Sequence, residues 1–167
     1  MPIFRKKKGN LICLNILLIR TLKNKWCKYQ NIQKKQYSIF VKKSFKSPSH
    51  KSLYEREIQH YQKQGYALTN RFAAALYLLT SDFFIWKSSK YNIKANYIDF
   101  NSIDIKGADS RSYIIYKAAK DIIYKTTSVA FSDIIELTVT NDELFSILLV
   151  AMYISRYGIE VIETDKS

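Results

Sequence analysis

The stretch from Thr140 to Ile159, TNDELFSILLVAMYISRYGI, decides the fold that we predict from the sequence. Thr140 and Glu143 have the spacing of a capping box, in which each side chain accepts a hydrogen bond from the other residue's amide. Gly158 is suited to end the helix in a left-handed conformation. Most side chains between these signals are apolar: Leu144, Phe145, Ile147, Leu148, Leu149, Val150, Met152, Tyr153 and Ile154. Because a helix that is apolar all round is covered on several sides, we expect it to be the centre of the core.

The residues at its two ends support this helix. Asp142 and Glu143 complement the positive N-terminus of a helix, and Arg156 complements the negative C-terminus. Val139 and Leu144 have the spacing of a hydrophobic staple. The sequence therefore predicts both boundaries as well as the helix itself.

The formal charge of +13 is confined to the first fifty residues of this 167-residue chain. Residues 1–50 contain 13 Lys and Arg and no Asp or Glu, whereas residues 51–167 contain 14 of each sign. Four glycines and two prolines are few chain breakers, which favours helices. We therefore predict an all-α protein, a single compact bundle of five or six helices over residues 50–167. Residues 1–49 form a basic, poorly ordered N-terminal extension in this prediction.

The start of the extension has some features of a targeting segment. Arg5–Lys8 followed by the apolar Leu11–Ile19 resembles the first two regions of a secretory signal. The sequence that follows is again basic and has no small-residue cleavage site. Nine residues are also far fewer than the roughly 20 that a helix needs to cross a bilayer. We predict no membrane span.

The rest of the extension leaves three interpretations open. Its lysines alternate with Tyr29, Tyr37, Phe40 and Phe45, a pattern that can stack bases and neutralise phosphates. A solvated basic tail without a fixed fold has the same composition. Alternatively, residues 1–50 lack Ala, Asp and Glu and have one Gly and one Val. Since all five share a first codon base of G, translated AT-rich non-coding DNA would look like this, and the functional chain would then begin near Ser49.

The sequence after Pro48 predicts the remaining helices. Ser52 and Glu55 form a second capping box for a helix that ends at Gly65. Its apolar face consists of Tyr54, Ile58 and Tyr61. Thr69 or Asn70 caps an apolar helix over residues 71–79, in which three alanines allow a close neighbour. Ser81–Asp82 caps a short helix over residues 83–86.

The second half of the domain begins with its least regular segment. Tyr97, Phe100 and Ile103 could form a short extended segment, but we predict residues 91–108 to be mostly loop that packs aromatic side chains onto the bundle. Asp109–Ser110 starts a helix that runs to about Lys125, with apolar residues at helical spacing. Residues 132–137 form one further short helical turn before the final helix.

A search for chemistry yields no catalytic, cofactor-binding or metal-binding residues. Cys13, Cys27, His50 and His60 lack the close ligand pairs of a structural zinc site. The acidic residues of 99–109 begin like a calcium loop but lack its turn glycine. Residues 52–80 have the outline of a helix-turn-helix, but their second helix is nearly all apolar and therefore belongs in the core.

The order of features from Leu53 onward resembles a family of small all-helical proteins from low-GC Gram-positive bacteria. A polar helix precedes a YLL-type helix, Gly107-Ala108-Asp109-Ser110 opens an Ala-containing helix, and the last helix has the pattern Leu-x-x-x-Leu-x-x-Ala. The similarity covers about 105 residues. The resemblance implies a cytoplasmic location and no assigned activity, so it transfers no functional residues.

Two classes of function follow. The first is a non-enzymatic module for protein interaction or regulation, with a protein partner or a second copy meeting the aromatic surface around Phe83, Phe84 and Trp86. These side chains can equally be core residues. The alternative is a nucleic-acid-binding protein that uses the basic extension for affinity.

Overall fold

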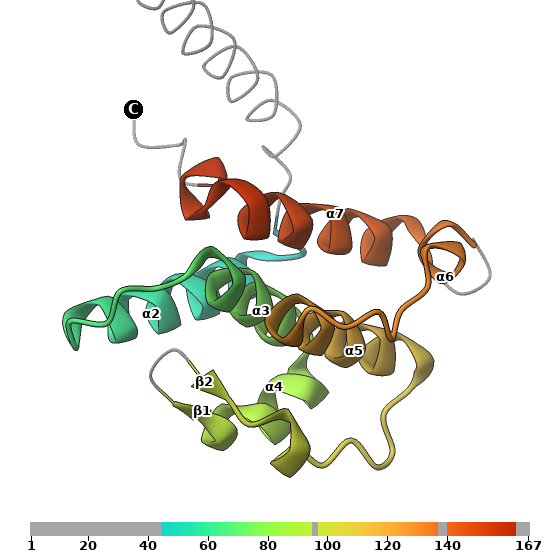
Figure 1. The fold of residues 1–167 in the computed structure, drawn as a ribbon, viewed down its shortest axis with the longest axis horizontal. Helices are drawn as coiled ribbons and strands as arrows, with labels where there is room; N and C mark the ends of the chain where they lie inside the picture. The colour runs from blue at the N-terminus through green and yellow to red at the C-terminus, as the bar shows by residue number, and fades with distance from the viewer. Residues whose placement is uncertain (1–44, 95–96, 137–139, 163–167) are drawn as a thin grey trace, which may run out of the picture. The chain divides into compact units, whose positions relative to one another are not determined.

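The computed structural model describes residues 45–94, 97–136 and 140–162. These residues form six α-helices, a two-stranded antiparallel hairpin and three short 3₁₀ helices. The predicted all-α class is confirmed (Figure 1). In chain order the elements are α2 (Pro48–Lys63), α3 (Asn70–Ser81), α4 (Phe83–Ser89), η1 (Lys90–Asn92), β1 (Ile93–Lys94), β2 (Tyr97–Ile98), η2 (Phe100–Ser102), α5 (Ser110–Tyr124), α6 (Phe131–Ile135), α7 (Asp142–Tyr157) and η3 (Ile159–Val161).

Helix α3 is the centre of the bundle. Every residue from Phe72 to Ser81 is buried, and α3 contacts α2, α4, α5 and α7. In Figure 1 it lies between α7 on one side and α4 with the hairpin on the other. The expectation that the final helix occupies this place was wrong, because α7 leaves Phe145 and Met152 exposed, whereas every residue of α3 from 72 to 81 is buried.

The sequence of α3 suits burial on all sides. Thr69 caps the helix by accepting a hydrogen bond from the Phe72 amide at 3.2 Å. The alanines at 73–75 have no side chain beyond Cβ, so neighbouring helices can approach the backbone closely. The two buried hydroxyls near its end are satisfied within the helix, since Thr80 donates to the Leu76 carbonyl at 2.8 Å and Ser81 to the Leu78 carbonyl at 2.7 Å.

Helix α7 begins one residue later than predicted. Asn141 is the N-cap and accepts from the Leu144 amide at 2.9 Å. Thr140 instead donates its hydroxyl to the Asp133 carbonyl at 2.8 Å, so the predicted capping box was wrong. Val139, the other half of the predicted staple, lies outside the described residues.

Helix α7 ends at Gly158, as predicted. Gly158 has a φ of 93° and donates its amide to the Ile154 carbonyl at 2.8 Å. A Cβ at this position would stand 3.3 Å from Oδ1 of Asn70, the first residue of α3. The end of α7 therefore packs closely against the start of α3.

The helical unit also begins earlier than predicted. Ser47 caps α2 by accepting from the His50 amide at 3.1 Å, and Pro48 occupies the first turn, so the predicted capping box at Ser52 was wrong. The ring of Phe45 packs against the rings of Tyr54 and Tyr77. The described part of the helical unit therefore includes residues before 50, where we began the domain. The structure of residues 1–44 is outside the described part.

The segment between α4 and α5 buries only one of its three aromatic side chains, because Phe100 is buried while Tyr91 is 81% and Tyr97 49% exposed. The prediction that its aromatic side chains pack onto the bundle is therefore right for Phe100 and wrong for the two tyrosines. The segment is more regular than predicted, because it contains the 3₁₀ helices η1 and η2 and a short hairpin in which Ile93 pairs with Ile98. Phe100 is fully buried. Tyr116 of α5 donates its hydroxyl to the Phe100 carbonyl at 2.7 Å, which ties this segment to the bundle.

Candidate functional site

The two histidines have different structural roles. His50 is 3% exposed, its Nε2 lies 3.0 Å from the Tyr77 carbonyl, and its Nδ1 accepts from the Lys46 amide at 3.3 Å. Burial lowers the pKa of His50 to about 4, so the ring is neutral at pH 7. His60 is exposed and contacts Gln64. Cys13 and Cys27 lie outside the described residues.

The three aspartates of the candidate calcium loop are separate turn and cap residues. Asp99 accepts from the Ser102 hydroxyl at 2.7 Å, and Asp104 accepts from the Lys106 amide at 2.9 Å. Asp109 caps α5, and the hydrogen bond from the Ser112 amide lowers the pKa of its carboxyl. In the described part of the chain, no three His, Cys, Asp or Glu residues are grouped as metal ligands.

The helix-turn-helix interpretation is also excluded for the described domain. A recognition helix has to present side chains to the major groove. Every residue from 72 to 81 of α3 is buried instead. This helix is the core, as its apolar sequence predicted.

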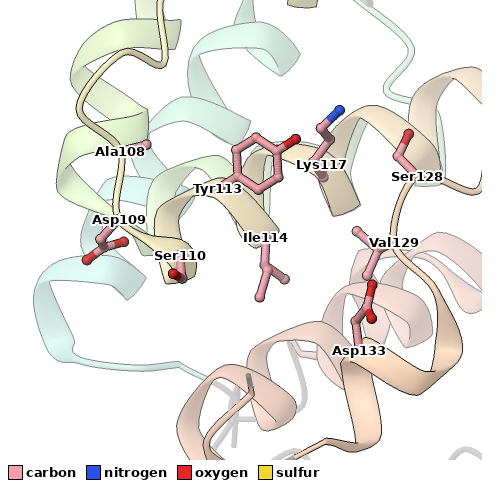
Figure 2. A pocket seen from close by; sticks show the side chains of 9 residues that line it. All are labelled: Ala108, Asp109, Ser110, Tyr113, Ile114, Lys117, Ser128, Val129 and Asp133. Atoms are coloured by element: carbon pink, nitrogen blue, oxygen red, sulfur yellow. The ribbon is translucent and has the colours of Figure 1, made fainter. Parts of the chain in front are cut away.

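A surface pocket of about 390 Å³ lies between the start of α5, the loop that follows α5, and α6 (Figure 2). Its apolar lining comes from Ala108, Ile114 and Val129. The polar lining consists of two aspartates, two serines, one tyrosine and one lysine. The polar lining residues are Asp109, Ser110, Tyr113, Lys117, Ser128 and Asp133.

The polar groups of this pocket are largely engaged in the fold. Asp109 caps α5, and Asp133 accepts from the Ala130 amide at 3.1 Å at the start of α6. The Lys117 ammonium lies 5.3 Å from the centre of the Tyr113 ring, and Figure 2 shows the two side chains next to each other. The loop wall is tied to α5, because Asp121 accepts from the Val129 amide at 2.9 Å and from the Thr126 hydroxyl. The lining contains no histidine or cysteine, so it offers no imidazole base and no thiol nucleophile.

The second candidate is the outer face of α7, which we define as Asp142, Phe145, Leu149, Met152, Tyr153 and Arg156. Helix α7 buries a different set of side chains against the bundle, namely Leu144, Ile147, Leu148, Val150, Ala151 and Ile154. On the outer face Phe145 is 36% exposed and Met152 is 45% exposed, while Leu149 and Tyr153 are half-buried. Apolar side chains thus follow the outside of this helix for about two turns.

The two acidic residues in the first turn of α7, Asp142 and Glu143, have different surroundings. Glu143 turns toward the bundle, where Arg111 of α5 donates to Oε2 at 2.9 Å and the Lys46 ammonium lies 3.8 Å from Oε1. The hydrogen bond from Arg111 lowers the pKa of the Glu143 carboxyl. Asp142 is exposed and belongs to the outer face.

The surface that we predicted around α4 is only partly exposed. Phe83 is 82% exposed and Phe84 is 37% exposed. Trp86 is half-buried and packs against the core. Asp82 caps α4 as predicted, accepting from the Ile85 amide at 3.0 Å. The exposed part of this surface therefore consists of two phenylalanines at the start of a short helix.

Comparisons with known proteins do not add a family to these observations. No family model, no curated protein and no solved structure matches the chain. Among the described helices, none combines the length and the apolar character needed to cross a membrane. The candidate sites therefore rest on their own geometry.

Two of these features could not be identified by our sequence analysis. The sequence does not indicate that Arg111 pairs with Glu143, because the two residues lie 32 positions apart. We also interpreted the outer face of α7 as core. The signal was present, because positions 142, 145, 149, 152 and 156 repeat at intervals of three and four residues. A second, longer apolar set on the same helix obscured it.

Proposed function

We propose that the protein is a non-enzymatic helical module that works by binding another protein surface. The observation that carries this proposal is the outer face of α7, where Phe145, Leu149 and Met152 leave apolar surface open on the outside of a folded domain. Exposed apolar surface that continues along one element is typical of protein–protein contact sites, whereas single exposed apolar residues are ordinary.

The pocket beside α5 supports an enzymatic role less well. Its two carboxylates already accept hydrogen bonds from backbone amides at helix starts. A general base has to reach a substrate proton with its lone pair available. The pocket residues thus contribute mainly to the ends of α5 and α6.

We propose a cytoplasmic location in a bacterial cell. Both cysteines precede residue 28, so the helical domain depends on packing rather than on disulfide bonds. This suits a reducing compartment. The resemblance to small helical proteins of low-GC Gram-positive bacteria points to the same location.

Site-specific photo-crosslinking in cells that naturally make the protein tests the function. Met152 is replaced by a photoreactive phenylalanine analogue, and adducts are identified by mass spectrometry. We expect a covalent adduct to a protein, because Met152 lies in the middle of the exposed apolar surface.

The matched control places the same analogue at Gln59, which is exposed on α2 away from apolar neighbours. Adducts at position 152 but not at 59 support a contact through α7. Equal labelling at both positions, or none at 152, contradicts the proposed function.

Nucleic-acid binding is the second candidate, favoured by the concentration of thirteen positive charges in residues 1–50. Phosphate contacts make the logarithm of the affinity fall with the logarithm of salt concentration, with a slope of roughly −0.7 per contact for single strands. Replacing Arg5–Lys8 by glutamine should make this slope shallower if the segment binds phosphates. An unchanged slope, or no binding by the full chain at low salt, removes this candidate.

A further inference from the structure

The outer face of α7 has a symmetry in its own sequence. Leu149 is at its centre, Asp142 lies seven residues before it, and Arg156 lies seven residues after it. At 1.5 Å per residue, the two charges stand about 10 Å from Leu149 in opposite directions along the helix. An apolar centre is thus bounded by one negative and one positive side chain on the same face.

Both end charges are available for an external partner. Asp142 is exposed, and among the ion pairs of the described residues the acidic partner at this end of α7 is Glu143 rather than Asp142. Arg156 is exposed, and its guanidinium lies 5.4 Å from the centre of the neighbouring Tyr157 ring. Among the residues that the structure describes, neither charge forms an ion pair with another element of the bundle.

Other exposed apolar side chains of the domain lack this arrangement. Phe83 and Phe84 lie at the start of the seven-residue α4, and Phe131 and Ile135 lie on the five-residue α6. These two helices are too short to present an apolar centre with a charged side chain two turns away on either side. The outer face of α7 is the longest apolar face that the described residues leave open on one helix.

We propose that the outer face of α7 binds the same face of a second copy of this chain, with the two helices antiparallel about a two-fold axis beside Leu149. This inference rests on the proposed function and names the partner. The two-fold axis places Asp142 of each copy next to Arg156 of the other, so the ends attract, and the antiparallel helix dipoles are also favourable. Leu149 then faces its own counterpart, with Phe145 and Met152 beside it, which gives the pair an apolar centre.

The contact is small, since a single helix face buries less than the roughly 800 Å² per partner of a standard interface. We therefore expect a reversible dimer with a dissociation constant in the micromolar range, on the order of 10 μM. Sedimentation equilibrium of the full chain from about 1 to 200 μM in low salt measures it directly.

A charge-swap cycle on the full chain tests the orientation. Asp142→Lys alone and Arg156→Glu alone each bring like charges together at both ends of the pair and should weaken the dimer about tenfold. The double variant restores opposite charges and should return the dissociation constant to within about threefold of the original. A parallel pair, or a contact elsewhere, predicts no such rescue.

A matched pair of apolar substitutions tests the location. Met152→Lys should weaken the dimer at least tenfold, because it brings a charge into the apolar centre. Phe83→Lys changes a more exposed phenylalanine on α4 and should leave dimerisation unchanged. Circular dichroism of every variant, which should show an unchanged helical spectrum, separates a lost contact from a lost fold.

Several outcomes overturn the inference. They are a full chain that stays monomeric at 200 μM, a double charge swap that dimerises no better than either single variant, and a dimer that Phe83→Lys disrupts but Met152→Lys does not. A monomer that still forms a heterologous adduct at position 152 in cells would refute self-pairing and leave the proposed function standing. A monomer without any adduct would refute both.

Discussion

Helices α3 and α7 have similarly apolar sequences but occupy different environments. Every residue of α3 from 72 to 81 is buried, whereas α7 buries one face and leaves Phe145 and Met152 on the other. The difference follows from side-chain size and charge. Three consecutive alanines let neighbours surround α3, while α7 has charged residues at both ends and large side chains all round. Apolar content alone therefore does not identify the central helix of a bundle.

The largest expected effect separates the two helices directly. Leu76→Ala in α3 should lower the free energy of unfolding by about 3–5 kcal/mol, because it leaves a cavity among side chains with no exposure. Met152→Ala on the outer face of α7 should change it by less than about 0.5 kcal/mol. Urea unfolding at 1 μM, where a weak dimer is dissociated, measures both. Similar losses in the two variants would contradict the assignment of α3 as the centre.

The next effect concerns the contact between α2 and α3 at His50. The folded pKa of about 4 lies below the ordinary value of 6.5, so the unfolded chain takes up a proton first. The contribution of His50 to the free energy of unfolding is therefore fully present above pH 6.5, and it is lost as the pH falls toward 4. The linkage amounts to about 2 kcal/mol between pH 7 and pH 5, and about 3 kcal/mol by pH 4.

Thermal or urea unfolding between pH 7 and pH 5 checks this linkage. The carboxyls of Asp109 and Glu143 have pKa values lowered from 3.8 and 4.5, so they titrate below this window. His50→Gln should remove most of this pH dependence, because it removes the buried imidazole. A flat profile for the unmodified chain would show that His50 is not buried as described.

A smaller effect tests the junction between α7 and α3. Gly158 combines a φ of 93° with a ψ of 176°, a conformation that is nearly restricted to glycine, and it approaches Asn70 of α3. Gly158→Ala should cost about 2 kcal/mol in the free energy of unfolding. Asn70→Ala in the same background relieves the close approach but not the backbone strain, so it should recover only part of this cost. Full recovery would show that contact, not conformation, requires the glycine.

The smallest effect distinguishes the observed cap of α7 from the predicted one. Asn141→Ala should cost about 1 kcal/mol, because it removes the acceptor for the Leu144 amide. Asn141→Ser keeps a hydrogen-bond acceptor and should lower the free energy of unfolding by at most a few tenths of a kcal/mol. Helix content and urea unfolding of the two variants provide the measurement. If Asn141→Ala leaves the free energy of unfolding unchanged, the result would favour Thr140 over Asn141 as the cap of α7.

The errors at helix starts have a common physical cause. At both α2 and α7 the sequence offers more than one polar side chain that can cap the helix. Ser47 rather than Ser52 caps α2, because the helix has to start early enough to place His50 against Tyr77. Asn141 rather than Thr140 caps α7, because the Thr140 hydroxyl is used by the Asp133 carbonyl. At α4 and α5 the predicted pairs Ser81–Asp82 and Asp109–Ser110 contain the observed caps, because in each pair the aspartate accepts from an amide of the first turn.

The sequence by itself determined the helical class, the separation of a basic segment from a charge-balanced domain, and the helix ends that depend on one residue and its near neighbours. These properties follow from local hydrogen bonding and from apolar spacing along the chain. Only the tertiary structure decided which apolar helix lies at the centre, which face of α7 stays open, and that Arg111 pairs with Glu143. Those outcomes depend on how closely helices distant in sequence approach one another, and periodicity along one helix cannot report that distance.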